Sequence, residues 1–311
     1  MPSYPPPYDQ FRPDWNIQAT NQPSHRDALS LALASQLVYR LINKDGQLVD
    51  EDETLAYNEK LEKENWEAAE QRISGQLTNW GFKDSKVIHV DKAHDIDTYG
   101  FVASTDSVIL VTFRGSASWK NWIANIQAVK DPGPFDDTCV HEGFQDSLYP
   151  ALLQFADAVQ TFQTSNQPLW VTGHSLGGAL AVLFTAMLLE NGYTIGGLYT
   201  FGAPRVGNYA FQEAMDQRMN GKPHHRYVNM DDLVPQLPPE PFFSHAGHRM
   251  ILNKDAMKPP TDSVDTWQSI KESFVRWYGQ IKDRNLKIKD AHLLATDDGY
   301  LPRLLAAVKL D

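Results

Sequence analysis

The segment Leu169–Leu180, LWVTGHSLGGAL, constrains the fold more than any other part of the chain. A short apolar run, typical of a buried strand, leads directly into GHSLG at residues 173–177 and then into an apolar helix. So tight a turn needs glycines at 173 and 177, because side chains there would collide with the neighbouring strand and helix. Ser175 is then expected to project at the carboxyl edge of a sheet, with the Leu176 amide turned toward any oxygen that becomes negative beside it. An ordinary glycine-rich turn is the alternative, which the flanking strand and helix and the further Gly178 disfavour.

The remainder of the chain predicts alternating strands and helices. The first helix is expected from Arg26 to about Ile42, with Ser24 and Asp27 at capping-box spacing. Another helix should begin close to Pro150 rather than at Phe144, because proline interrupts a helix interior. Further strands are expected at 87–90, 99–104, 107–113, 169–172, 197–201 and 226–230, and further helices near 66–80, 180–189 and 209–219. This order predicts an α/β fold with a mostly parallel central sheet and helices on both faces.

Composition limits the partners. Lys and Arg total 28 against 39 Asp and Glu, a net charge of −11, which argues against nucleic acid and strongly anionic membranes. The chain has none of the roughly 18-residue apolar runs that span a membrane. It also shows no secretory signal, so we expect a cytoplasmic protein, or a secreted one whose leader is removed or that uses a leaderless route. The single Cys139 excludes an internal disulfide and a multi-cysteine metal site, and no metal or organic cofactor is expected.

A nucleophilic serine needs a histidine to take its proton and an acid to orient that histidine, in the chain order Ser, acid, His on this kind of sheet. The acid is expected at Asp231 or Asp232, which position alone does not separate. The histidine candidates are His224, His225, His245, His248 and His292. Position favours His292 because it lies on a late segment, while His245 and His248 stay possible.

Several further motifs follow one another in a fixed order. They are TFRGS at 112–116 followed by NWI at 121–123, VHEGF at 140–144, GHSLGG at 173–178, FGAPRVG at 201–207, and DLVP at 232–235. Together they resemble the class 3 lipase family of α/β-hydrolases, which contains the fungal triacylglycerol lipases and their feruloyl esterase relatives. The resemblance covers about residues 29–292. It implies an α/β-hydrolase fold with an oxyanion loop and a short lid helix at about 115–137, and because 311 residues suit one large domain and not two, we expect a single domain over residues 1–311.

The resemblance also implies roles for particular residues. The nucleophile is Ser175, the acid Asp232 and the base His292, and the oxyanion amides are those of Ser116 and Leu176. His245 matches a non-catalytic position of the family. His174 and His141 are interpreted as supports of the elbow and its surroundings.

The candidate lid carries apolar side chains on one face, namely Trp119, Trp122, Ile123 and Ile126. A helix this short is marginal alone in water, so its position should depend on what its apolar face contacts. One hypothesis is a movable lid that covers Ser175 in water and presents this face to lipid. The alternative is a fixed helix packed on the core.

An inserted segment at about 254–289 departs from the fungal pattern and is predicted to carry a helix. That helix either enlarges the core or forms a wall of an acyl pocket. The predicted function is that of a serine carboxylic-ester hydrolase, specifically a triacylglycerol lipase, acting on neutral lipid esters at a lipid–water interface. The alternatives are an esterase of soluble, feruloyl-type esters, a phospholipase, or a catalytically silent binding module. The sequence predicts no oligomeric state.

Overall fold

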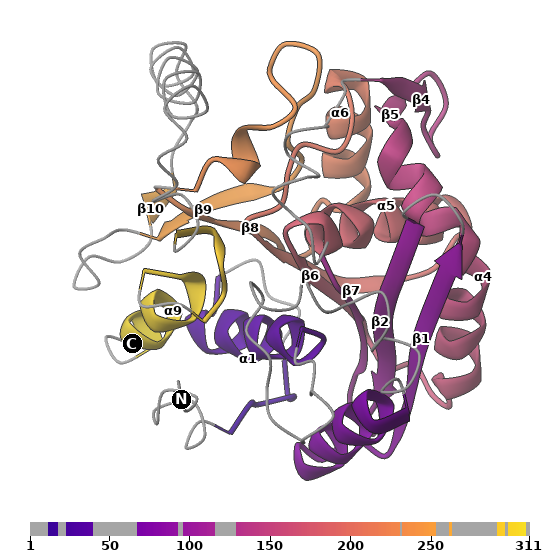
Figure 1. Ribbon diagram of the computed structural model, residues 1–311. Coiled ribbons are helices and arrows are strands. Elements are labelled where there is room, and N and C mark those ends of the chain that lie inside the picture. Colours follow the sequence, from indigo (N-terminus) through magenta and orange to yellow (C-terminus); the bar gives the residue numbers. More distant parts are fainter. Residues whose placement is uncertain are drawn as a thin grey trace.

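A computed structural model describes residues 12–17, 23–39, 67–92, 96–115, 129–230, 232–252, 261–262, 291–295 and 298–308. Within these residues, eight strands form one sheet in the order β1-β2-β3-β6-β7-β8-β9-β10 (Figure 1). The strands β3, β6, β7, β8 and β9 pair in parallel. At one edge β1 and β2 pair antiparallel with each other and β2 with β3, and at the other edge β10 pairs antiparallel with β9. The predicted mostly parallel central sheet is therefore confirmed.

The strand bounds place the carboxyl ends of the central strands at one edge. The sheet contains β1 (Asp84–Lys92), β2 (Ile96–Ser104), β3 (Ile109–Phe113), β6 (Leu169–His174), β7 (Ile195–Phe201), β8 (His224–Asn229), β9 (His248–Leu252) and β10 (Thr261–Asp262). A separate pair of short strands consists of β4 (Lys130–Pro132) and β5 (Cys139–His141). In the parallel register Phe113 lies beside Gly173, and Gly173 lies beside Thr200. The turn after β6 therefore emerges between the ends of β3 and β7.

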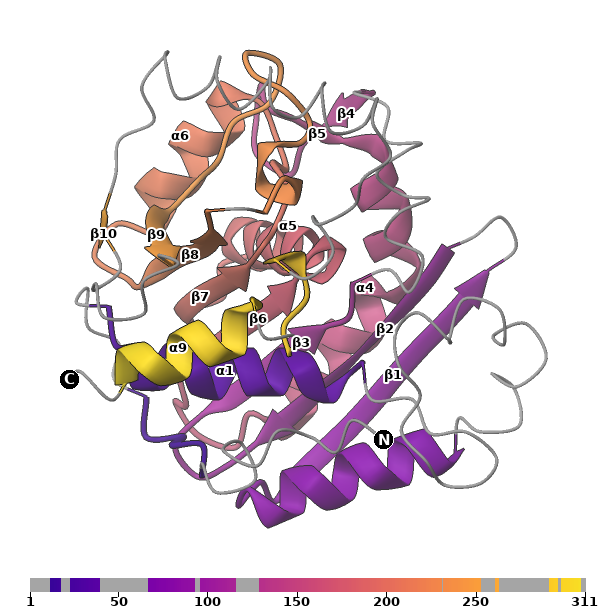
Figure 2. The same cartoon turned by 60° about the vertical axis from the view of Figure 1, so that its left-hand side comes forward.

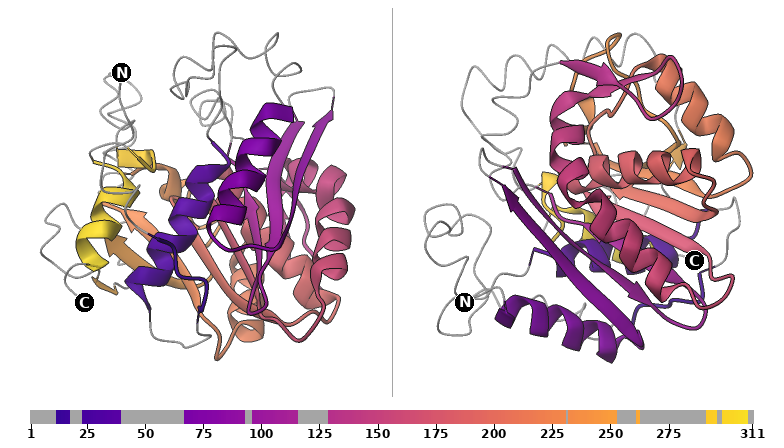
Figure 3. Two further views of the ribbon diagram at one scale, coloured as in Figure 1. Left: turned by 90° about the horizontal axis from the view of Figure 1, so that it is seen from below. Right: turned by 90° about the vertical axis from the view of Figure 1, so that its right-hand side faces the viewer.

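Helices cover both faces of the sheet (Figure 2 and Figure 3). The helices are α1 (His25–Leu37), α4 (Glu142–Phe162), α5 (Leu176–Glu190), α6 (Tyr209–Arg218) and α9 (Tyr300–Val308), with a short 3-10 turn η1 (Val234–Gln236), and residues 67–79 are also helical. One face is covered by α1, α9 and residues 67–79, and the other by α4, α5 and α6. The predicted cap of α1 is present, because the Ser24 hydroxyl accepts a hydrogen bond from the Asp27 amide. The helix ends at Leu37, earlier than predicted, and residues 40–42 lie outside the described part of the chain.

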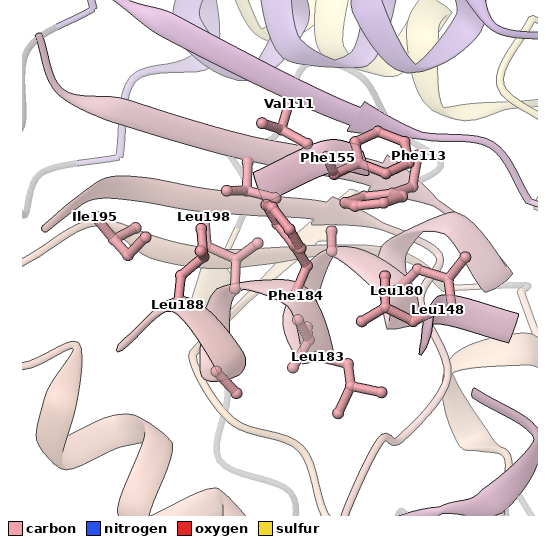
Figure 4. Packing of buried hydrophobic residues seen from close by; sticks show 14 of the residues in the cluster. Val111, Phe113, Leu148, Phe155, Leu180, Leu183, Phe184, Leu188, Ile195 and Leu198 are labelled. Carbon is pink, nitrogen blue, oxygen red and sulfur yellow. The ribbon is translucent and has the colours of Figure 1, made fainter. Parts of the chain in front are cut away.

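The core between the sheet and α4 and α5 is aromatic at its centre (Figure 4). The Phe113 ring lies 4.5 Å from Phe155 and 5.3 Å from Phe184, centroid to centroid. On the opposite face Trp170 of β6 is fully buried in a second cluster with α1 and α9. Close packing on both faces holds β6 in place, so the end of this strand is a rigid position for a functional side chain.

The prediction that a helix begins near Pro150 is wrong. Helix α4 begins at Glu142 and continues through Pro150 to Phe162. The missing Pro150 N–H leaves the carbonyl of Asp146 without a helical partner, but Asp146 is exposed, so water can replace that bond. Phe144 is fully buried in the core upstream of the proline, and burial of this kind stabilises the first turn. The other predicted elements in the described residues are present, with shifted ends.

Candidate active site

The turn after β6 holds Ser175 in an uncommon backbone conformation. Ser175 has φ 57° and ψ −130°, and α5 begins at the next residue. A positive φ is strained for a residue with a side chain and persists only where the surrounding structure enforces it. The Ser175 amide donates to the Phe201 carbonyl at 2.9 Å, which fixes the turn against β7. The side chain is thereby held at the carboxyl edge of the sheet.

Neighbouring backbone explains the glycines on either side. A Cβ atom at Gly177 would lie 2.2 Å from the carbonyl oxygen of Phe113 at the end of β3. A Cβ atom at Gly173 would lie 2.2 Å from the carbonyl oxygen of Gly177 itself. Since the obstructing atoms belong to backbone, the turn closes only with glycine at both positions, as the sequence predicts.

Three residues that the sequence singles out meet at this turn. The Nε2 atom of His292 lies 2.9 Å from the Ser175 hydroxyl oxygen, and its Nδ1 atom lies 2.9 Å from Oδ2 of Asp232. All three side chains are buried. Because an ionised carboxylate only accepts hydrogen bonds, Nδ1 carries the proton toward Asp232 and Nε2 is left as the acceptor of the serine proton. Ser175 and His292 are separated by 117 positions in sequence, so only the fold brings them together.

The Asp232 carboxylate is satisfied on both oxygens. Oδ1 accepts the Val234 amide at 2.9 Å, and Oδ2 accepts the Tyr300 hydroxyl at 2.5 Å in addition to His292. Burial, with the nearby negative charge of Asp232, holds the pKa of Tyr300 well above its usual value, so this hydroxyl stays a donor. The neighbouring acid candidate, Asp231, lies outside the described residues.

Residues 291–295, which we name the base loop, carry His292. The Asn229 side chain at the end of β8 donates from Nδ2 to the Ala291 carbonyl at 2.8 Å and to the Asp298 carbonyl at 2.7 Å. The Tyr300 hydroxyl accepts a hydrogen bond from the backbone amide of Asn229 at 3.2 Å. Asn229 therefore binds the base loop directly at Ala291, and Tyr300 in turn binds Asn229; neither residue belongs to a recognised motif.

Residues 232–240, the acid loop, are anchored from the FGAPRVG segment. The Arg205 amide donates to the Leu237 carbonyl at 2.7 Å. Its guanidinium donates to the Pro238 carbonyl and to Oε1 of Glu240, each at 3.1 Å. A buried arginine with several acceptors fixes loop geometry more firmly than a surface ion pair does. Arg205 thus explains why this segment accompanies the acid loop.

The other histidines do not bind Ser175 in the described part of the chain. His224 and His225 are buried in β8, and His248 lies in β9. His245 hydrogen-bonds through Nε2 to the Pro235 carbonyl at 2.6 Å. Burial, together with the positive charge of Arg226, holds the pKa of His245 well below its usual value, so it supports the acid loop as a neutral group.

The two predicted supports differ from one another. His174 is buried directly against His292, with the two ring centroids 4.7 Å apart. His141 stacks instead on Phe144 at 4.4 Å, at the start of α4.

One of the two predicted oxyanion amides can be placed. Leu176 is the first residue of α5, and an amide there has no carbonyl in a preceding helical turn to bind. Several predicted residues lie outside the described part of the chain, namely Ser116, Trp119, Trp122, Ile123 and Ile126. The inserted segment 254–289 also lies outside it, apart from β10.

Sequence reasoning did not identify Tyr39, Asn229 or Tyr300. Tyr39 follows α1, and its hydroxyl accepts the Gly115 amide at 2.8 Å, at the start of the predicted oxyanion loop. A single tyrosine or asparagine outside a motif carries no periodic or spacing signal. Their partners are 60 or more positions away, so only the fold could reveal them.

Two further properties concern the described residues alone. They contain no group of three or more His, Cys, Asp or Glu side chains placed to hold a metal ion. None of their helices is both long and apolar enough to cross a membrane.

Comparison with known proteins gives a consistent result. The family model for lipase (class 3) matches residues 110–242, from β3 to just past the acid loop. A lipase of Rhizomucor miehei is 41% identical over 194 residues, which is 59% of this chain and 52% of the relative. Secreted mono- and diacylglycerol lipase A of Penicillium cyclopium is 31% identical over 194 residues, covering 60% of this chain and 59% of the relative.

A solved structure of Rhizomucor miehei triacylglyceride lipase superposes with a TM-score of 0.53 at 33% identity, covering 62% of this chain and 77% of that one. The chain thus spans little more than half the length of the curated relatives it matches. The matched family segment contains Ser175 and Asp232, while His292 lies beyond it.

Proposed function

The chain belongs to the class 3 lipase family and has its α/β-hydrolase fold, and from that premise we propose that it hydrolyses carboxylic esters. Ser175 is the nucleophile, His292 the general base and acid, and Asp232 the residue that orients His292. The observation that carries the proposal is the placement of His292, whose two ring nitrogens lie 2.9 Å from Ser175 and 2.9 Å from Asp232. A nucleophile, a base and an orienting acid in this geometry suit acyl transfer.

The reaction follows from these positions in two steps. Ser175 Oγ attacks the ester carbonyl carbon while His292 Nε2 takes the hydroxyl proton. His292 then donates that proton to the departing alcohol, which leaves an acyl group on Ser175. A water molecule next attacks the acyl carbonyl, again losing its proton to Nε2, and the carboxylic acid departs as Ser175 regains its proton. Asp232 holds the Nδ1–H tautomer throughout.

The negative oxygen of each tetrahedral intermediate needs donors aimed at it. The Leu176 amide is well suited because it opens α5 directly after the nucleophile, and the helix dipole adds to its effect. We propose the Ser116 amide as the second donor, since Ser116 directly follows Gly115, whose amide is fixed by Tyr39.

Neutral acylglycerols are the proposed substrates, with triacylglycerols first. The net charge of −11 disfavours anionic substrates. Large apolar side chains are also exposed around the loops of the site: Met230 at the end of β8 is 55% exposed and Phe242 after the acid loop 57%. Phe242 lies beside Lys130, which belongs to the 115–137 segment, with the Lys130 ammonium 5.6 Å from the Phe242 ring. Exposed apolar side chains on both flanks of the acid loop suit contact with lipid. Mono- and diacylglycerols are the second candidate, favoured by the similarity to the Penicillium enzyme.

Three structural expectations stay proposals. Residues 1–311 are proposed to form one domain, in which residues 115–137 contain a lid that opens at a lipid surface. Equal specific activity below and above substrate aggregation would contradict the moving lid. For residues 254–289 we propose that the inserted helix enlarges the core, and a deletion that changes the preferred acyl-chain length would instead place it at the acyl pocket.

The proposed function is tested by hydrolysis of a p-nitrophenyl ester series and of emulsified triacylglycerol. Wild type is compared with Ser175→Ala and His292→Ala, and with Ser107→Ala as an exposed serine away from the site. We expect both active-site variants to lose about 10⁴-fold or more in kcat, as triad deletions do, and Ser107→Ala to match wild type. Activity limited to short soluble esters would favour an esterase over a lipase. A wild type without activity would favour the silent binding module.

A further inference from the structure

Three segments far apart in the chain are joined by hydrogen bonds beneath the site. Tyr39 follows α1, His174 ends β6, and His292 lies in the base loop. The Tyr39 hydroxyl lies 3.1 Å from Nδ1 of His174, and Nε2 of His174 lies 2.7 Å from the carbonyl oxygen of His292. The Tyr39 oxygen also accepts the Gly115 amide at 2.8 Å. His174 therefore stands between the start of the proposed oxyanion loop and the backbone of the base.

The chemistry of the groups gives each bond a direction. A carbonyl oxygen only accepts, so Nε2 of His174 must carry a proton and donate to His292. Burial, with the neighbouring His292, holds the pKa of His174 well below its usual value, so the ring is neutral. Its Nδ1 is then an acceptor, and the Tyr39 hydroxyl is placed to donate to it at 3.1 Å, with the His174 carbonyl oxygen at 3.2 Å as a second acceptor for the same proton. Tyr39 can still accept from Gly115, because one hydroxyl both donates and accepts.

The ring contacts add a second constraint. His174 packs 4.7 Å from the His292 ring, tilted by 35°, and meets Tyr300 edge-on at 5.9 Å. During acyl transfer His292 becomes positive, and a second cation at this distance would oppose that charge. A neutral imidazole avoids this repulsion while it still fixes the backbone of His292.

We propose that His174 is a positioning residue, which aligns His292 with Ser175 by holding the His292 carbonyl and holds Gly115 through Tyr39. This role rests on the proposed function, since it serves the proton transfer between Ser175 and His292. It goes beyond a packing role because each ring nitrogen has a separate task. Loss of the bond to His292 should displace Nε2 from the serine hydroxyl, and misplacement of a catalytic group by about 1 Å costs on the order of 100-fold in rate.

Two amide substitutions separate the tasks of the two nitrogens. The side-chain amide of glutamine reaches as far as Nε2 of histidine, whereas that of asparagine reaches only as far as Nδ1. His174→Gln therefore keeps a donor for the His292 carbonyl, and His174→Asn removes it. We expect His174→Asn to lose about 100-fold in kcat with KM unchanged. We expect His174→Gln to stay within about fivefold of wild type, since it loses only the bond to Tyr39.

Further variants keep the test decisive. Tyr39→Phe removes one oxygen atom and should lower kcat about fivefold, even if both His174 variants fail to fold. His224→Asn is the matched control: it changes another buried histidine, at the opposite end of a parallel strand, and should lower stability but not kcat. Each kcat is calculated per active site, and the concentration of active sites is measured with a covalent serine-reactive probe. Unfolded protein then does not lower the kcat of a variant.

Each outcome has a separate meaning. Equal kcat in His174→Asn and His174→Gln, or a Tyr39→Phe variant indistinguishable from wild type, would overturn the positioning role while the ester hydrolase stands. A wild type that neither hydrolyses esters nor takes up the probe would overturn the proposed function itself, and the positioning role with it.

Discussion

The nucleophile elbow and the base loop place the two ends of the proposed proton transfer by different means. Ser175 is fixed by backbone: it lies between a strand and a helix, its amide binds the Phe201 carbonyl, and backbone atoms crowd the glycines beside it. His292 lies on a short loop that is fixed by side chains from distant elements. Asn229 binds the Ala291 carbonyl in the loop and the Asp298 carbonyl beyond it, and His174 holds the carbonyl of His292 itself.

This difference explains why one part of such a site can be recognised from a short stretch of sequence and the other cannot. A turn enforced by neighbouring backbone needs particular residues at adjacent positions, so it leaves a motif. A loop held by side chains needs only one donor or acceptor at each remote point, so it leaves none. The elbow should therefore fail through steric overlap, and the base loop through loss of single hydrogen bonds.

The largest effect is expected for Gly177→Ala. The added Cβ would lie 2.2 Å from the Phe113 carbonyl oxygen, so the end of β3 or the turn must shift. We expect a loss of about 3 kcal/mol in the free energy of unfolding and of at least about 100-fold in kcat/KM. Gly75→Ala is the control, because no described atom lies within 4 Å of its added Cβ and alanine favours a helix by about 0.5–1 kcal/mol. Chemical denaturation and ester hydrolysis measure both, and a Gly177→Ala variant as active as Gly75→Ala would contradict the backbone account of the elbow.

A smaller loss is expected for Asn229→Asp. The change replaces the donor that binds the Ala291 and Asp298 carbonyls with a carboxylate oxygen that repels them. We expect kcat to fall roughly 30-fold, corresponding to about 2 kcal/mol for the two lost bonds. Asn208→Asp is the matched control, because Asn208 uses its oxygen, which accepts the Phe211 amide at 2.9 Å, and aspartate keeps that acceptor. Steady-state kinetics compare the pair. Equal losses at the two positions would rule out a specific role for the Asn229 donor.

Tyr300→Phe tests the contact with Asp232. It removes the hydroxyl that donates to Asp232 at 2.5 Å and accepts the Asn229 amide at 3.2 Å. We expect kcat to fall about tenfold and the free energy of unfolding to fall by about 1–2 kcal/mol. Tyr199→Phe is the control, since this buried hydroxyl interacts with the Ser24 backbone away from the site. It should lower stability without lowering kcat. If the two variants had the same kcat, Tyr300 would have only a structural role.

The smallest effect is expected for His224, which lies outside the active site and should change only how the free energy of unfolding depends on pH. Burial lowers the pKa of His224 from 6.5 to about 3 in the folded chain. Below pH 6.5 the unfolded chain therefore binds a proton that the folded chain refuses, so this contribution to stability is complete above pH 6.5 and is lost as pH falls toward 3. Between these limits, His224→Gln should make the free energy of unfolding fall less steeply with acid, by up to about 1.4 kcal/mol per pH unit. Denaturant titrations at several pH values measure the slope, and identical slopes would show that His224 is not buried as described.

Prediction from the sequence succeeded where patterns are local. The α/β architecture followed from apolar runs that alternate with helical periods, and the elbow followed from its glycines. The structure also brings Asp232 and His292, predicted from chain order and resemblance, to Ser175. The start of α4 was mispredicted because tertiary burial around Phe144 outweighs the cost of Pro150.

The residues that hold the base loop could not have been predicted in the same way. Asn229 is the last residue of β8 and Tyr300 the first of α9, where each has an ordinary place in the pattern of its element. Their roles depend on hydrogen bonds that span 60 or more positions. Such contacts are a property of the packed fold, and a single sequence contains no periodic signal of them.

The most direct measurement of the central claim is intact-protein and peptide mass spectrometry after treatment with a covalent serine-reactive probe. The geometry predicts one adduct per chain, located on Ser175, absent from Ser175→Ala and formed about 10³-fold or more slowly in His292→Ala, because the base is needed to activate the hydroxyl. An adduct on another residue, or equal labelling rates with and without His292, would contradict the assignment of Ser175 and His292.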